Sequence, residues 1–376
     1  MKISLSKWIS DWRDNGGGRS PHLGTIITLL IIFIGLFGSL YSDEIKSVVP
    51  FQWGTWNGWE SFHFHPRILF FWVVTIFVGG LYFFREWEVD SYDSQLRKEL
   101  VSQIQTLPPA EFLQEFADTY DEGEAMYEKA LQSKNVDDTK KIIRGLLTCI
   151  CQLTEKFDSP KQHTQMERYA ANIMLFIDAS SADKELSEQI QPRIKFIDQE
   201  VLFQTLKGAL DLRKDLSTHS EAQQSEEDMA LEAFALPIPH AETTNIDGKN
   251  KYRVLPGAPL AYCESRTELH MQSSEIYKWC EDHGDFTAHV KKQIKEYFSG
   301  NGGKQVASFL SIPLMTDRKS KPIGVINIHK NGPMLLVDPK RLLHFDPIIR
   351  PYRHMLAKLV QQLLILEKEA LSSKKD

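Results

Sequence analysis

Two short apolar stretches near the end of the chain decide the fold class: Val306-Ala-Ser-Phe-Leu-Ser-Ile-Pro313 and Ile323-Gly-Val-Ile-Asn-Ile-His329. Both are rich in residues that favour β-strands, and a polar segment, residues 316–321, separates them. Two such runs joined by a turn predict an antiparallel hairpin. Pro313 suits a strand end because it has no N–H to donate to a ladder, and Gly324 permits close approach of a neighbouring backbone.

The segments before this hairpin and after it complete a mixed pattern of strands and helices. Residues 169–178 form an apolar run typical of a buried strand, and residues 194–203 predict a second strand. A helix is expected from Asp137, where Asp137 and Asp138 can cap its start, and another is expected over residues 345–368. In both helices the apolar positions gather on one face. The sequence therefore predicts an α+β fold.

The hairpin resembles the signature of GAF domains, in which a strand ending in Pro-Leu and a polar turn precede a strand that starts with Gly-Val. Here these elements are Ser308-Phe-Leu-Ser-Ile-Pro313-Leu314 and Pro322-Ile-Gly324-Val325-Ile-Asn-Ile328. Upstream, Leu255-Pro-Gly257-Ala-Pro-Leu-Ala261 is similar to the family's short helix before its variable ligand-side segment. The resemblance covers residues 137–367. It implies an antiparallel sheet with helices on one face and, where a ligand binds, a pocket on the other.

The sequence departs from the ligand signatures of several GAF subfamilies. None of the four cysteines is followed by histidine, so the bilin-attachment pattern is missing. The cyclic-nucleotide signature cannot be assembled, because Lys156-Phe157-Asp158 gives a fragment of it in the leading helix rather than in the pocket. The acidic segment 217–228 is longer than a compact GAF domain needs, and no histidine kinase, cyclase or diguanylate cyclase output follows the domain.

If a ligand binds, the resemblance places the segment 256–298 over the pocket as its lid. Arg253, Tyr262, Arg266 and Trp279 are then the candidate ligand contacts, because arginine pairs with phosphate or carboxylate and aromatic rings stack. The two aromatic residues fit the hydrophobic core equally well. The expected ligand is a small molecule, with a nucleotide as one candidate, and no cofactor is expected.

Two apolar runs near the start of the chain, residues 24–41 and 68–84, contain no charged residue. Each is close to the roughly 20 residues that a helix needs to cross a bilayer. Arg67 and Arg85 bracket the second run, as suits headgroup contacts at both ends. We expect two transmembrane helices after a tail of residues 1–23. The competing interpretations are one buried helical hairpin and, for the first run, a cleaved signal peptide.

Lysine and arginine residues near the two runs set the expected orientation. The tail and the segment after the second run are both basic, whereas the connecting loop holds only Lys46 before Arg67. By the positive-inside rule both termini are cytoplasmic and the loop lies outside, so we expect a multi-pass protein of the inner (plasma) membrane. The loop is rich in aromatic residues, which suits the membrane interface. Its His63 and His65 are too few ligands to predict a metal site.

Residues 86–136 predict a helical connector between the transmembrane hairpin (residues 24–85) and the GAF-like domain (residues 137–376). Its first half carries an apolar stripe at four-residue spacing: Leu96, Leu100 and Ile104. The stripe fits a packed connector and a dimerising signalling helix equally well. We expect a homodimer or a higher oligomer.

The composition argues against several classes of function. The formal net charge of −6 offers no basic face for nucleic acid. The four cysteines fall on the expected cytosolic side and do not have zinc-site spacing. Gly300-Asn-Gly-Gly-Lys304-Gln305 lacks the spacing and the Ser or Thr of a phosphate-binding loop. No nucleophile elbow or HExxH motif is present, and the polar cluster at 281–285 is typical of an exposed loop. The sequence does not predict an enzyme.

Three hypotheses of function share this architecture. In the first, a membrane-anchored sensor binds a small molecule in its cytosolic domain and relays binding to the membrane helices or to a partner. In the second, the protein is a ligand-triggered effector of a bacterial defence system that perturbs the membrane; that analogy rests on architecture alone. In the third, the GAF-like fold is a scaffold that binds another protein and no small molecule.

Overall fold

The computed structural model describes residues 21–43, 66–108, 112–158, 167–198, 200–221, 232–246, 248–300, 305–317 and 320–373. The chain divides into two compact units, Met1–Gln105 and Thr106–Asp376. Residues 1–20 of the amino-terminal tail and residues 44–65 of the aromatic-rich loop lie outside the described residues. So do most of the glycine-rich turn at 300–305 and the middle and end of the acidic segment 217–228.

The first unit contains two apolar helices, α2 (Pro21–Leu40) and α4 (Pro66–Thr106). Within the described residues, one stretch, Phe70–Trp87 of α4, is long and apolar enough to cross a membrane, and 6% of it is buried. The apolar part of α2, Ile27–Leu40, is shorter. By length and composition, one described helix could therefore cross a membrane, and both predicted transmembrane spans stay predictions.

Aromatic side chains join α2 to α4. Phe37 stacks on Phe71 with ring centres 6.2 Å apart, and a Cβ at Gly38 would already touch the Phe71 ring. α4 continues past its apolar stretch to Thr106 and stops two residues before Pro108, which cannot continue a helix. The first half of the predicted connector is therefore part of the same helix as the apolar stretch.

The second unit is built around a six-stranded antiparallel sheet with the strand order β3-β2-β1-β8-β7-β6. Its strands are β1 (Tyr169–Asp178), β2 (Gly208–His219), β3 (Ala235–Ile238), β6 (Glu268–His270), β7 (Ser308–Leu314) and β8 (Gly324–Lys330). A separate hairpin pairs β4 (Thr243–Ile246) with β5 (Lys249–Tyr252). The predicted strand 169–178 and the predicted hairpin are confirmed, and β8 lies between β1 and β7 at the centre of the sheet.

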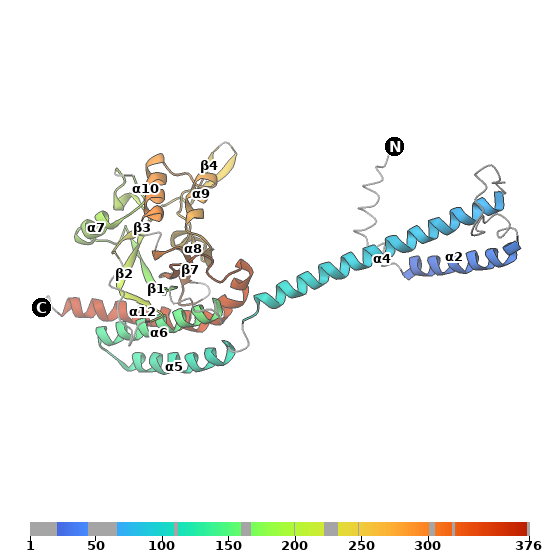
Figure 1. Ribbon diagram of the computed structural model, residues 1–376. Helices are drawn as coiled ribbons and strands as arrows, with labels where there is room; N and C mark the ends of the chain where they lie inside the picture. Colours follow the sequence, from blue (N-terminus) through green and yellow to red (C-terminus); the bar gives the residue numbers. More distant parts are fainter. Residues whose placement is uncertain are drawn as a thin grey trace. The chain divides into compact units, whose positions relative to one another are not determined.

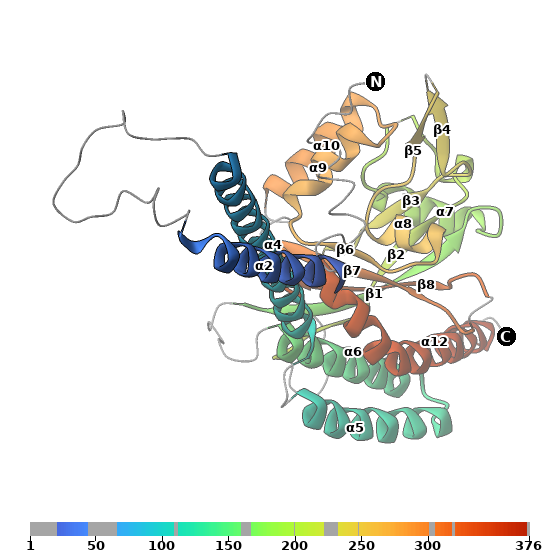
Figure 2. The ribbon, with the colours of Figure 1, turned by 90° about the vertical axis from the view of Figure 1, so that its right-hand side faces the viewer.

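Helices lie on both faces of this sheet (Figure 1, Figure 2). One face packs against α6 (Val136–Asp158) and α12 (Leu342–Ser372), and α5 (Phe112–Gln132) packs on these two helices. The opposite face carries α8 (Ala258–Glu264), α9 (Ser274–Asp282) and α10 (Ala288–Ser299). The remaining elements are α7 (Lys184–Ile190) and the short turns η3 (Gln191–Arg193), η4 (Phe203–Thr205) and η5 (Pro339–Arg341). The α+β prediction is confirmed.

Alternation along the central strands builds the main core between the sheet and helices α6 and α12. Successive side chains of a strand point to opposite faces, so alternate residues of β7 and β8 share the buried face. Leu310 and Ile312 of β7 meet Ile326 and Ile328 of β8 there, and all four are fully buried. The residues between them, such as Asn327, face the other side of the sheet, where the candidate site lies.

Gly324 has the role expected for it, since a Cβ at this position would collide with the carbonyl oxygen of Met174 on β1. Glycine is therefore required for β8 to pair closely with β1 here. Pro313 lies in β7 beyond the last residue that pairs with the short edge strand β6, where a missing N–H breaks no ladder bond on that side. Gly324 thus permits the close pairing of β8 with β1, and Pro313 lies where β7 no longer pairs with β6.

The predicted strand at 194–203 is wrong, and β2 takes its place in the sheet. Ile194 makes a single isolated bridge to Ala235, and Phe196 has a φ of 60°, which is incompatible with an extended strand. The polar residues that interrupt this stretch give no sustained apolar face. The structure places the second long strand at Gly208–His219, so the start of the acidic segment 217–228 belongs to a strand.

The residue that caps the start of α6 also lies two positions before Asp137, the first of the two predicted capping residues. The side-chain Oδ1 of Asn135 accepts hydrogen bonds from the backbone N–H groups of Asp137 and Asp138, at 2.8 and 3.2 Å. Asn135 is therefore the capping residue, and the two aspartates occupy the first turn. Their carboxylates are favourable there because the helix amino terminus carries partial positive charge.

Candidate ligand cavity

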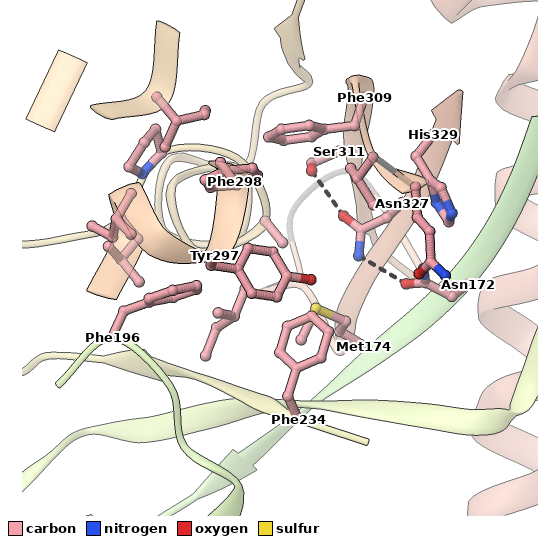
Figure 3. Close-up of a pocket in the computed structure, with 18 of the residues that line it drawn as sticks. Asn172, Met174, Phe196, Phe234, Tyr297, Phe298, Phe309, Ser311, Asn327 and His329 are labelled. Atoms are coloured by element: carbon pink, nitrogen blue, oxygen red, sulfur yellow. Dashed lines mark hydrogen bonds between the residues drawn. The ribbon is translucent and has the colours of Figure 1, made fainter. Parts of the chain in front are cut away.

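A cavity of about 480 Å³ opens on the face of the sheet that points away from α6 and α12 (Figure 3). Strands β1, β8 and β7 supply its floor, and α8, α9, α10 and the residues before β3 supply its walls. The volume lies within the range of about 300–1,000 Å³ that is usual for small-molecule sites. The cavity lies on the face that the resemblance assigns to a ligand pocket, but α8, α9 and α10 also cover this face (Figure 2), whereas the resemblance implied helices on the other face alone.

Aromatic side chains form a large part of the cavity wall. Phe196, Phe234, Tyr297, Phe298 and Phe309 line it, and they come from four segments of the chain, with Tyr297 and Phe298 adjacent in α10. Figure 3 shows these rings gathered around the space above the floor. Burial raises the pKa of Tyr297, so its hydroxyl remains a neutral hydrogen-bonding group across the physiological range. The walls therefore favour an apolar, flat molecule over a heavily hydrated one.

Three polar side chains cross the floor on three neighbouring strands, and we call them the polar ladder: Ser311 on β7, Asn327 on β8 and Asn172 on β1. The register places Ser311 and Asn172 each opposite Asn327. The Ser311 hydroxyl donates to Oδ1 of Asn327 at 2.8 Å, and Nδ2 of Asn327 donates to Oδ1 of Asn172 at 3.0 Å (Figure 3). Ser311 and Asn172 are buried, so this bonding offsets the cost of removing them from water.

Two carboxylates stand at the cavity, and each has a lysine partner. Oε2 of Glu232 accepts a hydrogen bond from Nζ of Lys195 at 2.8 Å, and this bond lowers the pKa of Glu232. The carboxylate of Glu296 lies 3.8 Å from Nζ of Lys292, one helical turn earlier. Among the described residues that line the cavity there is no lysine or arginine. The described lining therefore offers no lysine or arginine side chain to an anion.

One side of the cavity is closed by residues 194–198, which we call the strap. Nζ of Lys195 lies 5.5 Å from the ring centre of Phe234 and 5.4 Å from that of Tyr297, which is cation–π geometry. The next residue, Phe196, packs edge-on against Tyr297 at 5.4 Å. Its φ of 60° lies in the left-handed region, which is unfavourable for a bulky residue. The contacts of the Lys195 and Phe196 side chains with Phe234 and Tyr297 hold this strained backbone in place.

A second cavity of about 460 Å³ lies beside the strap. Its lining is more polar and includes Arg253, Asp285 and His240. Phe196 and Leu255 line both cavities, so these two residues form a shared wall. On this side the Thr287 hydroxyl donates a hydrogen bond to Oδ1 of Asp198 in the strap, at 2.7 Å. The two residues are 89 positions apart, so this bond is a tertiary contact.

The structure does not bring the four predicted contact residues together, and none of them lines the larger cavity. Arg253 lines the second cavity, half-exposed, with its Nε 4.0 Å from Asp285. Tyr262 is buried in α8 and stacks on Phe176 at 4.7 Å, so it has the core position that the sequence left open. Burial raises its pKa. A ligand role for either residue stays a prediction.

The other two predicted contacts also have partners within the protein. Arg266 is exposed and its Nε pairs with Glu264 at 2.6 Å and with Glu268 at 2.9 Å. Trp279 of α9 packs against Tyr252, with ring centres 5.3 Å apart. The predicted lid segment 256–298 nevertheless supplies α8, α9 and α10, and its residues form much of the cavity wall.

The polar ladder was missed because each of its members looks unremarkable in its own strand. The signal in the sequence is the phase of the polar residues: Ser311, Asn327 and Asn172 each interrupt an apolar strand at a position that faces away from the main core. Polar residues buried on the second face of a central strand indicate a site rather than a solvated surface. Alignment of the three strands in space is needed to see that they meet.

The cysteine thiols do not form a reactive centre in the described part of the chain. None of the four forms a disulfide, and burial raises the pKa of Cys149, Cys263 and Cys280 to about 12. These thiols stay protonated at neutral pH, and the protonated form is a poor nucleophile. Among the described residues, no group of three His, Cys, Asp or Glu side chains is arranged to hold a metal ion.

Comparison with known proteins gives only weak structural likeness. No protein-family model matches the sequence, and no curated protein matches it. The chain is similar to a crystal structure of the GAF domain region of a protein from Geobacter sulfurreducens PCA that is provisionally classed as a membrane protein. The two are 13% identical, the match covers 60% of this chain and 93% of that chain, and the TM-score is 0.27. A likeness at this level carries no argument about function.

Proposed function

We propose that this protein is a membrane-anchored, non-enzymatic sensor. In this proposal its GAF-like domain binds a small molecule in the larger cavity and relays binding to the membrane helices or to a partner. The observation that carries the proposal is the cavity of about 480 Å³, with aromatic walls and a hydrogen-bonded polar floor. Apolar lining with a few placed polar groups is typical of ligand sites.

The arrangement of layers supports the GAF-like assignment. The resemblance implies helices on one face of the sheet and a ligand pocket on the other. Here α6 and α12 pack on one face, and the cavity lies on the other. The two halves of the signature form β7 and β8, which are neighbours at the centre of the sheet. The polar ladder lies on these two strands and on β1.

Membrane anchoring is the second part of the proposal, and the apolar, exposed stretch Phe70–Trp87 supports it. The test is carbonate extraction of membranes from cells that express the full chain, in which we expect the protein to remain with the membranes. Gly79→Arg places a charge near the middle of the stretch, where no described atom lies within 4 Å of the new Cβ. It should add about 2.5–3.5 kcal/mol to insertion and release protein into the soluble fraction. Glu86→Arg, near the end of the stretch, is the matched control, and release of the unmutated chain would contradict anchoring.

Ligand binding is tested by the thermal stability of the full chain in lipid nanodiscs against amines, carboxylates, nucleotides and uncharged heterocycles. A compound at a hundredfold its Kd adds about 2.7 kcal/mol to a folded state that alone binds it, which gives a shift of a few degrees in Tm. Val306→Trp fills the cavity and should abolish the shift. Leu343→Trp, at an exposed position, should leave it unchanged. A folded chain that responds to no compound would favour the protein-binding scaffold.

A further inference from the structure

The hydrogen-bond donors and acceptors of the polar ladder indicate which kind of ligand the cavity can bind. A side-chain amide offers a donor and an acceptor side by side, and two amides and a hydroxyl stand here in a row across adjacent strands. Within the described part of the chain, the ladder uses one oxygen of each asparagine and the Nδ2 group of Asn327. Asn172, at the end of the row, keeps its Nδ2 group for a molecule in the cavity that it lines.

An asparagine amide fits a particular kind of partner edge. It can form two parallel hydrogen bonds with a group that presents a donor and an acceptor next to each other in one plane. Nitrogen heterocycles with an exocyclic amino or oxo group have such an edge, whereas simple hydrocarbons and aliphatic alcohols do not. A ligand of this kind can hydrogen bond at the floor with its ring plane directed into the cavity.

The walls fit the flat faces of the same molecule. Phe234 from the segment before β3, Tyr297 from α10 and Phe309 from β7 approach the space above the polar ladder (Figure 3). Stacking on aromatic rings suits any flat heterocycle and does not depend on a specific substituent. The floor and the walls therefore favour one class of molecule, a planar heteroaromatic ring.

The charges on the described lining residues disfavour the phosphorylated members of that class. Glu232 and Glu296 are the charged groups among these residues, and each is paired with a lysine. A phosphate in the cavity would lie near carboxylates, and the described lining offers no lysine or arginine to offset the phosphate's lost hydration. An uncharged ring gives up much less hydration when it enters the cavity.

We propose that the ligand of this cavity is an uncharged heteroaromatic base with an adjacent donor and acceptor, as in a free nucleobase, a nucleoside or a pteridine, and not a nucleotide. This inference rests on the proposed function and narrows it to one chemical class. The polar ladder binds the hydrogen-bonding edge, and the aromatic wall stacks on the ring.

The test uses the full chain in lipid nanodiscs and ligand-observed NMR with matched probes. The uncharged probes are the common purine and pyrimidine bases, their nucleosides and pterin. Each nucleoside is paired with its 5′-monophosphate, and naphthalene serves as a flat ring without a hydrogen-bonding edge. We expect at least one uncharged heterocycle to bind at least tenfold more tightly than its phosphorylated partner and than naphthalene.

Variants of the polar ladder connect binding to the named residues. Asn172→Leu keeps the approximate shape but removes the amide, and it should weaken binding of the heterocycle about tenfold while leaving naphthalene unaffected. Ser311→Ala should do the same to a smaller extent. Lys184→Ala, at an exposed position on α7, is the matched control and should change nothing. Unaltered Tm of each variant without ligand shows that the fold persists.

Four outcomes decide between this inference and the proposed function. Binding that fits the expected pattern and is lost in Asn172→Leu supports both. Monophosphates that bind as tightly as their nucleosides, or naphthalene that binds as tightly as the bases, overturn the ligand class and leave a binding cavity. If all these probes fail while other compounds stabilise the chain through the cavity, the class is wrong and the sensor proposal stands. If no compound of any class binds, both fail.

Discussion

Arg213 on β2 and Glu367 on α12 form a two-bonded ion pair, in which the guanidinium donates to both carboxylate oxygens at 2.7 and 3.1 Å. The two residues are 154 positions apart in the sequence. Lys140 of α6 joins them, with its Nζ 2.9 Å from Asp215 and 3.2 Å from Glu367. This cluster of four charges connects the outer part of the sheet to both helices that cover its main core.

Removal of Glu367 should destabilise the second unit. Glu367→Ala leaves Arg213 partly buried with one partner fewer, and hydrogen bonds to charged groups contribute about 1.5–3 kcal/mol. We expect a loss of that size in the free energy of unfolding, measured by urea denaturation followed by circular dichroism. Glu369→Ala, exposed on the same helix, is the control and should stay within about 0.5 kcal/mol. Equal effects of the two substitutions would contradict a stabilising role of the cluster.

Acid should weaken the same cluster. Burial alone would raise the pKa of Asp215, but the hydrogen bonds and charges of Arg213 and Lys140 outweigh it and lower this pKa to about 2. The pKa of Glu367 is also lowered, against the effect of burial, by the same two cations. A lowered carboxyl pKa stabilises the folded state above the unfolded pKa of about 4, and this contribution is lost as the pH falls from there towards 2.

The measurement for this acid effect is the urea midpoint of the wild type and of Arg213→Met between pH 7 and pH 3. The wild type should lose stability below about pH 4.5. Arg213→Met lacks the main cation of the cluster, so its stability should depend less on pH over the same interval. Parallel pH profiles for the two proteins would count against the cluster as the source of the acid sensitivity.

At position 196, a glycine variant should be more stable than an alanine variant, which is the reverse of the usual order. Its φ of 60° is readily adopted by glycine and costs other L-residues about 1–2 kcal/mol. Both Phe196→Ala and Phe196→Gly lose the ring contact with Tyr297, so their comparison isolates the backbone term. We expect the glycine variant to be more stable by about 1 kcal/mol in thermal or urea unfolding. A more stable alanine variant would show that the strap relaxes to an ordinary conformation.

Gly257 should tolerate no side chain, and its substitution should affect the cavity. Its φ is 86°, and a Cβ would lie 2.7 Å from the ring of Phe309. Gly257→Ala therefore combines backbone strain with displacement of a wall residue, and we expect a loss of about 2–3 kcal/mol in unfolding free energy. Ligands of the cavity should bind more weakly, because Phe309 is a wall residue and would be displaced. Gly248→Ala, also at positive φ but with no described atom within 4 Å of the new Cβ, separates strain from displacement.

The parts of the fold that the sequence predicts correctly are those with strong local patterns. β7, β8 and β1 are dense in β-branched and apolar residues, and α12 has a long one-sided apolar face. The prediction failed at 194–203, where Ile194 and Phe203 suggested a strand but the chain makes the strap. The φ of 60° at Phe196 depends on tertiary contacts with α10 and leaves no local pattern.

The candidate site was less accessible to sequence reasoning than the fold. Residues of the predicted lid segment 256–298 do line the cavity, because the segment lies between elements of the sheet in the chain, whereas its role as a lid stays a prediction. The individual contacts were selected by residue type, and Arg266 instead pairs with two glutamates close to it in the chain. The polar ladder depends on the register of three strands that are up to 155 residues apart, which no local pattern encodes.

The wall that Phe196 and Leu255 share between the two cavities has a thermodynamic consequence. A molecule in either cavity restricts the position of the same phenyl ring, and so changes the room left in the other. If occupancy of one cavity alters affinity at the other by some factor, reciprocity requires the same factor in the reverse direction. Couplings of this kind are usually about 1–3 kcal/mol, or 5–150-fold. Two chemically different compounds can thus change each other's affinity for this protein without ever occupying the same space.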